Sequence, residues 1–101
     1  MKVRYVWAGT VSQFHFAMEI MKIAALFGAQ TRIRRPNYVF SEETPPSLVK
    51  WFNDPYGDFS VEETKVIWKN FMSYPEIEKI SPQIWKELRH CAELGTEWRI
   101  E

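Results

Sequence analysis

The amino-acid sequence predicts a small single domain of the α/β class, with an α+β arrangement as the alternative. Three observations predict it. A strand–helix–strand pattern fills residues 1–40, amphipathic helical segments follow, and the last residues alternate between apolar and polar. The predicted order is β-α-β-α-α-α-β, with two or three strands and a long central helix that is mostly buried. The second-ranked interpretation is a mainly helical protein with a minimal β element.

The long helix is predicted over residues 11–27, VSQFHFAMEIMKIAALF. Its polar side chains recur at steps of three or four residues and share one narrow stripe, formed by Ser12, His15, Glu19 and Lys22. The remaining helix surface is apolar, which is typical of a helix that neighbouring elements cover on most sides. Gly28 follows the apolar run and fits a left-handed C-terminal stop, so the helix is expected to end there.

Strands are predicted at residues 2–8, at residues 29–35 with 38–40 as an extension beyond Pro36, and at residues 96–100, because each stretch alternates and contains β-branched or aromatic side chains. Pro36 lacks an N–H group, so the second strand is expected to end there or to lie at an edge. A helix that joins two strands normally makes them parallel. The first two strands are therefore predicted to pair in a parallel βαβ unit, with the terminal segment as a third strand.

The rest of the chain is predicted to be helical, with spans of 45–53, 61–72 and 82–94. Ser60 and Glu63 fit a capping box at the start of the second of these helices. Ser81 precedes a proline at the start of the third, and Gly95 follows its last apolar residue. One more helical turn is expected at residues 75–80.

Length and composition indicate one globular domain, since the chain has 101 residues and 46% of them are hydrophobic. No apolar run is long enough to span a membrane, and the first residues do not resemble a signal peptide. The single cysteine excludes an internal disulfide and favours a reducing compartment. A complete small cytoplasmic protein without a membrane segment is therefore expected, either a monomer or a homodimer.

Charge is unevenly distributed although the formal net charge is zero. Residues 1–40 form a basic part with a charge of +5, and residues 41–101 form an acidic part with a charge of −5. The two parts either neutralise each other across the fold or leave a basic face for a polyanion. Such a face would be a nucleic-acid site on the paired strands, made of Lys2, Arg4, Arg32, Arg34 and Arg35.

The first strand-to-helix turn is a candidate anion site, because helix N-termini present free amide groups to anions. Its residues are Gly9, Thr10 and Ser12. One glycine falls short of a nucleotide-binding fingerprint, however, and no lysine follows it. The alternative interpretation is that Thr10, together with Gln13, only caps the helix.

No metal site and no cofactor are predicted. The turn after residue 52 places Gly57 and Glu63 at the sixth and twelfth positions of a calcium loop, but it places Phe52 and Tyr56 at positions that need oxygen ligands. Cys91 falls on an apolar helical stripe and is expected to be an inert core thiol.

Aromatic side chains are abundant, and four of them flank one polar turn: Trp51, Phe52, Tyr56 and Phe59. Burying all four beside such a turn is difficult, and exposed aromatic residues are typical anchors of protein interfaces. These four are therefore the predicted partner-binding residues, with closure of the core edge as the alternative role.

No catalytic constellation is present in the sequence, which favours a non-enzymatic interaction or regulatory protein. Its expected action is to bind and occlude a partner protein or a protein–nucleic acid complex, in the manner of small phage-like inhibitors. The first alternative is nucleic-acid binding through the basic strands. The second is a small nucleotide or anion binder, or an enzyme, with its site at the first strand–helix turn.

Overall fold

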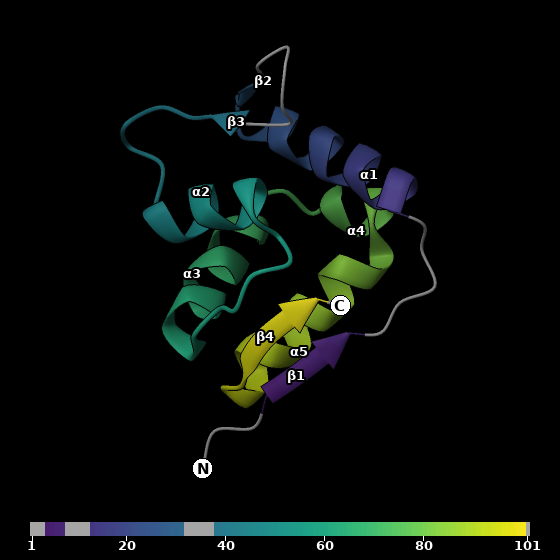
Figure 1. The fold of residues 1–101 in the computed structure, drawn as a ribbon, viewed down its shortest axis with the longest axis vertical. Helices are drawn as coiled ribbons and strands as arrows, with labels where there is room; N and C mark the ends of the chain where they lie inside the picture. The colour runs from purple at the N-terminus through teal and green to yellow at the C-terminus, as the bar shows by residue number, and fades with distance from the viewer. Residues whose placement is uncertain (1–3, 8–12, 32–37, 101) are drawn as a thin grey trace.

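The computed structural model describes residues 4–7, 13–31 and 38–100, and these form a helix-rich mixed fold (Figure 1). Its Cα radius of gyration is 12.8 Å, close to the ~13 Å expected of a single domain of this length. The strands are short and the helices carry most of the structure. One continuous hydrophobic core joins residues from every helix.

Helix α1 spans Gln13–Leu26, and Gly28 after it has a φ of 74°, the left-handed stop predicted for it. The buried side of α1 carries Phe16, Ile20, Ile23 and Ala24. The prediction that this helix is mostly buried was wrong, because its opposite side is open to solvent. Met18 and Met21 remain 37% and 46% exposed.

The strands pair differently from the prediction. Strand β1 (Arg4–Trp7) pairs in parallel with β4 (Glu97–Ile100) and not with the segment after α1. Figure 1 shows these two strands side by side next to α5. A single antiparallel bridge joins Phe59 to Trp98, so β4 has hydrogen-bonded neighbours on two sides.

The segment after α1 forms two strands in place of one. Strand β2 (Gln30–Thr31) pairs in antiparallel fashion with β3 (Tyr38–Val39), so the chain folds back on itself near α2. The parallel βαβ unit is therefore absent from the described part of the chain. Strand β3 is also held to α2, because Asn53 Oδ1 accepts from the Tyr38 N–H and Asn53 Nδ2 donates to the Tyr38 carbonyl.

Four more helices complete the fold: α2 (Pro46–Asn53), α3 (Val61–Phe71), α4 (Ile77–Ile80) and α5 (Pro82–Leu94). The capping box predicted at the start of α3 is present. The Ser60 side chain accepts from the Glu63 backbone N–H, and the Glu63 side chain accepts from the Ser60 N–H. Gly95 ends α5 with a φ of 68°, which turns the chain into β4.

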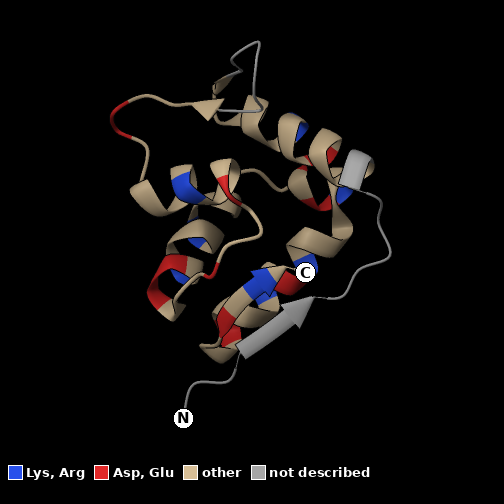
Figure 2. Ribbon diagram, in the orientation of Figure 1, with Lys and Arg blue, Asp and Glu red and all other residues tan. Residues whose placement is uncertain are grey.

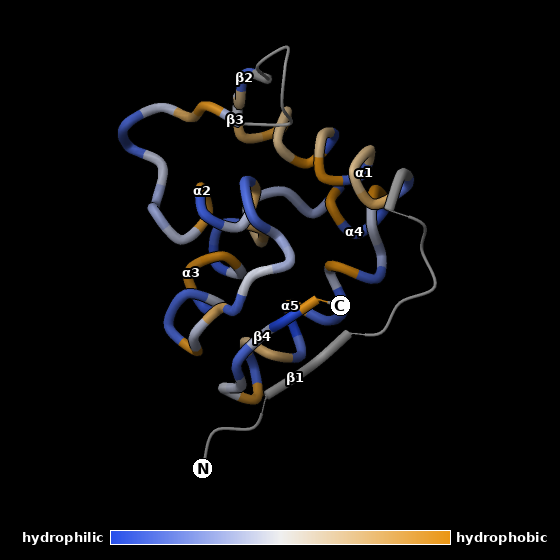
Figure 3. The backbone as a smooth tube through the Cα atoms, viewed as in Figure 1, coloured by the Kyte–Doolittle hydropathy of each residue, from blue (hydrophilic) through white to orange (hydrophobic). Residues whose placement is uncertain are grey.

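Aromatic rings fill the centre of the core. Trp51 of α2 stacks on Trp98 of β4 and meets Phe71 of α3 edge-on. Phe27, just after α1, contacts Phe52 and Phe71 and so joins α1 to the same cluster. Figure 3 shows where apolar residues occur along the helices, and it shows strongly polar positions on α5 and β4. Within the described ranges, no helix is both long enough and apolar enough to cross a membrane.

Candidate protein-binding groove

An apolar groove of about 250 Å³ lies between α1, β3 and the end of α2. Its lining is aromatic and aliphatic apart from one amide side chain, and consists of Phe16, Ala17, Ile20, Tyr38, Phe52, Asn53, Pro55 and Tyr56. Concave surfaces of this composition are the usual places where proteins receive ligands or anchoring side chains.

One wall of the groove is α1. Phe16 and Ile20 lie one helical turn apart and point into the core, so their buried rings and branches form a fixed apolar wall. Ala17 also lines the groove and is exposed, so the apolar lining extends from the groove onto the solvent-exposed side of α1.

Asn53 fixes the opposite wall by joining α2 to β3. Its Oδ1 accepts from the Tyr38 backbone N–H at 2.7 Å, and its Nδ2 donates to the Tyr38 carbonyl at 3.1 Å. Nδ2 also donates to the Val49 carbonyl within α2. Because the amide takes both backbone groups of Tyr38, it occupies the edge of β3 as another strand would.

Tyr56 closes the end of the groove from the turn between α2 and α3. Its ring centroid lies 5.4 Å from that of Phe16, and the side chain remains 45% exposed. A partly exposed aromatic ring held against a buried one is well suited to anchor a partner.

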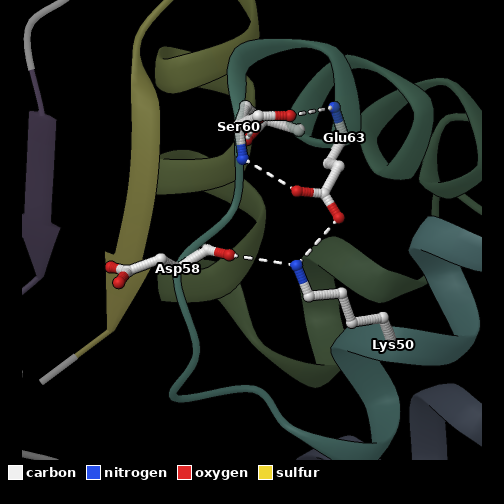
Figure 4. A network of polar contacts seen from close by, with 5 residues as sticks. Lys50, Asp58, Ser60 and Glu63 are labelled. Atoms are coloured by element: carbon white, nitrogen blue, oxygen red, sulfur yellow. Dashed lines mark hydrogen bonds and ion pairs between the residues drawn. The ribbon is translucent and has the colours of Figure 1, made fainter.

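A polar network holds the turn that carries Tyr56 (Figure 4). Lys50 Nζ of α2 donates to the Asp58 carbonyl at 3.2 Å and to Glu63 Oε2 of α3 at 2.9 Å. The same ammonium lies 4.8 Å from the centre of the Phe59 ring. The pKa of Glu63 is lowered, chiefly by the hydrogen bond that its carboxylate accepts from the Ser60 backbone N–H and further by Lys50, so this carboxylate is charged at neutral pH.

The groove contains two phenols and no charged side chain among its described lining residues. Burial raises the pKa of Tyr38 and of Tyr56, so both hydroxyls stay protonated at neutral pH. Asp54 lies between two lining residues in the sequence, but its carboxylate is turned toward Gly57 of the same turn. The described lining of the site is therefore suited to apolar contact and hydrogen bonding.

The exposed side of α1 continues the groove. We call it the α1 strip, formed by Ala17, Met18, Met21 and Ala25, all of which are exposed. Figure 2 shows how few acidic and basic residues α1 carries, since Glu19 and Lys22 are the only Asp, Glu, Lys or Arg residues between Gln13 and Leu26. The strip and the groove share Ala17 and so form one continuous apolar surface.

The four aromatic residues predicted to bind a partner divide into two groups. Trp51 and Phe59 are buried in the core, at 0% and 1% exposure, so the expectation that they are exposed was wrong. Phe52 is also buried, but it lines the groove together with Tyr56. Trp51, Phe52 and Phe59 are buried because Trp98 of β4 and Phe71 of α3 pack against them, which the sequence of the turn alone does not indicate.

The other candidate residues are not described. Lys2, Arg32, Arg34 and Arg35 of the predicted nucleic-acid face lie outside the described residues, and for Arg4 only the backbone of β1 is described. Gly9, Thr10 and Ser12 of the predicted anion site also lie outside them.

A second hollow, of about 340 Å³, runs along α5 and is polar. Glu87 contributes to it although its side chain is only 7% exposed, and its Oε2 has no hydrogen-bond partner within the described ranges. Burial raises the pKa of Glu87 to about 7. Burial also raises the pKa of the nearby Cys91 thiol, so this cysteine is not an activated nucleophile.

The described residues contain no group of three or more side chains arranged to hold a metal ion. No protein-family model, curated protein or solved structure matches the chain. The functional argument therefore depends on the groove, the α1 strip and their surroundings.

Proposed function

We propose that the protein is a small interaction module that binds a partner protein through the apolar groove and the α1 strip. The observation that carries this proposal is the continuity of the two surfaces, because an exposed apolar helix face leads directly into an apolar hollow at Ala17. Contiguous apolar surface of this kind is characteristic of binding sites on otherwise polar proteins.

The scaffold supports this role because it holds the site rigidly. Asn53 fixes one wall, and the network around Lys50 fixes the turn that carries Tyr56. A site that is formed before binding loses little conformational entropy when a partner arrives. The proposed regulatory action is occlusion, in which the bound module covers a surface of its partner that would otherwise be available.

The matched pair Met21→Arg and Met72→Arg tests the proposal. Both methionines are exposed, at 46% and 50%, but Met21 lies on the α1 strip and Met72 follows α3 and is not among the groove residues. Each variant, fused to the same tag, is cross-linked in a lysate of the native host and the captured proteins are quantified by mass spectrometry. A partner retained by the wild type and by Met72→Arg but lost from Met21→Arg is expected.

Equal capture by all three proteins would contradict the proposal. Thermal unfolding of the variants is the necessary control, since a Met21→Arg protein that unfolds at the wild-type temperature excludes misfolding as the cause of a lost partner.

A further inference from the structure

We infer that Met18 and Met21 form an oxidation-sensitive site, at which a peroxide converts the apolar α1 strip into a polar surface and so weakens binding of the partner. This inference rests on the proposed function and adds a form of regulation to the same site. Its structural basis is the distribution of sulfur in the fold, because the described methionines are exposed and the cysteine is buried.

The methionines of this protein lie where an oxidant reaches them. The sequence has four, and the three within the described residues, Met18, Met21 and Met72, are 37%, 46% and 50% exposed. Methionine is among the residue types most often buried in folded proteins, so this distribution is unusual. A thioether on the surface is open to a dissolved peroxide, which converts methionine to methionine sulfoxide.

The single cysteine does not compete for the oxidant. Cys91 is fully buried in the core, and burial raises the pKa of its thiol. Peroxides react with the thiolate and need access to the sulfur, so both properties protect this residue. Among the described residues, the side chains that offer sulfur to an oxidant are therefore the three methionines, and two of these lie on the α1 strip.

The positions of Met18 and Met21 make the strip sensitive to such a change. They lie three residues apart, so both are on one face of α1. They are also the only large side chains of the strip, since its other members are Ala17 and Ala25. Other residues form the buried side of the helix, so a modification here alters the strip and leaves the packing of α1 intact.

The chemical step transfers one oxygen atom. A lone pair of the thioether sulfur attacks one oxygen of hydrogen peroxide, and an S–O bond forms as the O–O bond breaks. The released hydroxide takes the proton from the transferred oxygen and becomes water. The sulfur is oxidised by two electrons, the peroxide is reduced by two, and the side chain becomes a polar sulfoxide.

The sulfoxide opposes binding because its oxygen accepts hydrogen bonds from water while the strip is exposed. An apolar partner surface that covers the strip removes this water. Helix α1 offers no replacement donor beyond its first turn, since its backbone N–H groups are used within the helix. Burial of a polar group without a hydrogen bond is unfavourable, so the oxidised strip binds an apolar surface more weakly.

Peroxide treatment of the wild type and of two leucine variants tests the inference. Leucine keeps the apolar volume of methionine and has no sulfur, so Met18→Leu/Met21→Leu preserves the strip. Met72→Leu is the matched control, since Met72 is not among the groove residues. Met1 lies outside the described residues and is common to all three proteins.

Three measurements follow each treatment. Mass spectrometry of proteolytic peptides locates the sulfoxides, thermal unfolding monitors the fold, and cross-linked capture from a lysate of the native host quantifies the partner. Sulfoxide is expected at all three described methionines of the wild type, while Cys91 stays reduced and the unfolding temperature stays the same.

Capture is expected to fall by about tenfold or more when the wild type or Met72→Leu is oxidised, because the partner must then cover unsatisfied polar groups. Oxidised Met18→Leu/Met21→Leu is expected to capture as much as before treatment. Methionine sulfoxide reductases that act on both sulfoxide epimers are expected to restore capture by the oxidised wild type.

Four results would overturn the inference: no sulfoxide at Met18 and Met21, unfolding on oxidation, equal capture by the oxidised and reduced wild type, or an equal loss of capture in the double leucine variant. If the reduced wild type captures a partner that Met21→Arg loses, and oxidation leaves capture unchanged, this inference fails and the proposed function stands. If the reduced wild type captures no partner, both fail.

Discussion

The indole rings of Trp51 and Trp98 stack with their centroids 5.6 Å apart and their planes inclined by only 15°. One ring comes from α2 and the other from β4, and both are buried. The stack therefore joins the helical part of the fold to the strand that pairs with β1. Neither Nε1 atom has a hydrogen-bond partner among the described residues, so packing alone holds the pair.

Trp51→Ala is expected to lower the free energy of unfolding by about 3–5 kcal/mol, because it removes a fully buried ring and leaves a cavity in the aromatic cluster. Trp85→Ala is the comparison, since Trp85 is only partly buried and meets Trp68 at the edge of the core. Urea denaturation measures both variants. Equal losses would contradict the assignment of Trp51 to the centre of the core.

Stability is expected to fall as the pH rises toward neutrality because of Glu87. The folded pKa of about 7 lies above the ordinary value of 4.5, so the folded state binds the proton more tightly than the unfolded state does. The contribution of the protonated carboxyl is fully present below pH 4.5 and is lost as the pH rises through 7. The shift corresponds to about 3 kcal/mol.

Glu87→Gln is therefore expected to unfold at a higher denaturant concentration than the wild type at pH 8 and at a similar one at pH 4. Glutamine resembles the protonated carboxyl and does not ionise, so the difference grows between these two values. Glu42→Gln, on an exposed loop, is the control for the loss of one negative charge. A pH-independent effect of Glu87→Gln would show that the carboxyl is not protonated in the folded protein.

Ser60→Ala is expected to cost about 1 kcal/mol of stability, because it removes the side chain that accepts from the Glu63 backbone N–H at the start of α3. Ser73→Ala is the control for the same substitution outside the capping box, since Ser73 is exposed just after the end of α3. Denaturant titration compares the two. If Ser60→Ala unfolds at the wild-type midpoint, the capping box contributes nothing measurable.

Asn53→Ala is expected to loosen the wall of the groove, because the Tyr38 N–H and carbonyl lose their partner. The amide hydrogen of Tyr38 should then exchange faster with solvent, by a factor of about ten, at an overall cost of about 1–2 kcal/mol. Asn70→Ala is the control, as the Asn70 side chain donates only within its own helix. Unchanged exchange at Tyr38 would mean that β3 is held by other contacts.

Most helix boundaries could be predicted from the sequence because their causes are local. The Ser60–Glu63 capping box and Gly95 act within one turn of the residues they affect, so the local sequence is enough to predict where these two helices begin or end. Strand pairing is a tertiary property. The alternation in residues 2–8 predicts a strand, but only the folded chain brings it beside β4.

One part of the groove could be predicted from the sequence. The aromatic residues beside the turn between α2 and α3 indicated a binding surface there, and Tyr56 does line the groove. The periodicity of α1 predicts an apolar helix but does not indicate which side of it the neighbouring elements leave uncovered. Met18 and Met21 look like core residues in the sequence and are exposed because the later helices cover only the opposite face.

The parallel pairing of β1 with β4 has a consequence for the order in which the chain folds. Arg4 is synthesised well before its partner Glu97, because the five helices lie between them in the sequence. Pairing across so long a loop carries a large entropic cost, and a parallel strand pair forms slowly. The helices from α2 to α5 are joined by short connections and are free to collapse first. During synthesis, β1 therefore cannot form its native strand pairing until β4 has emerged.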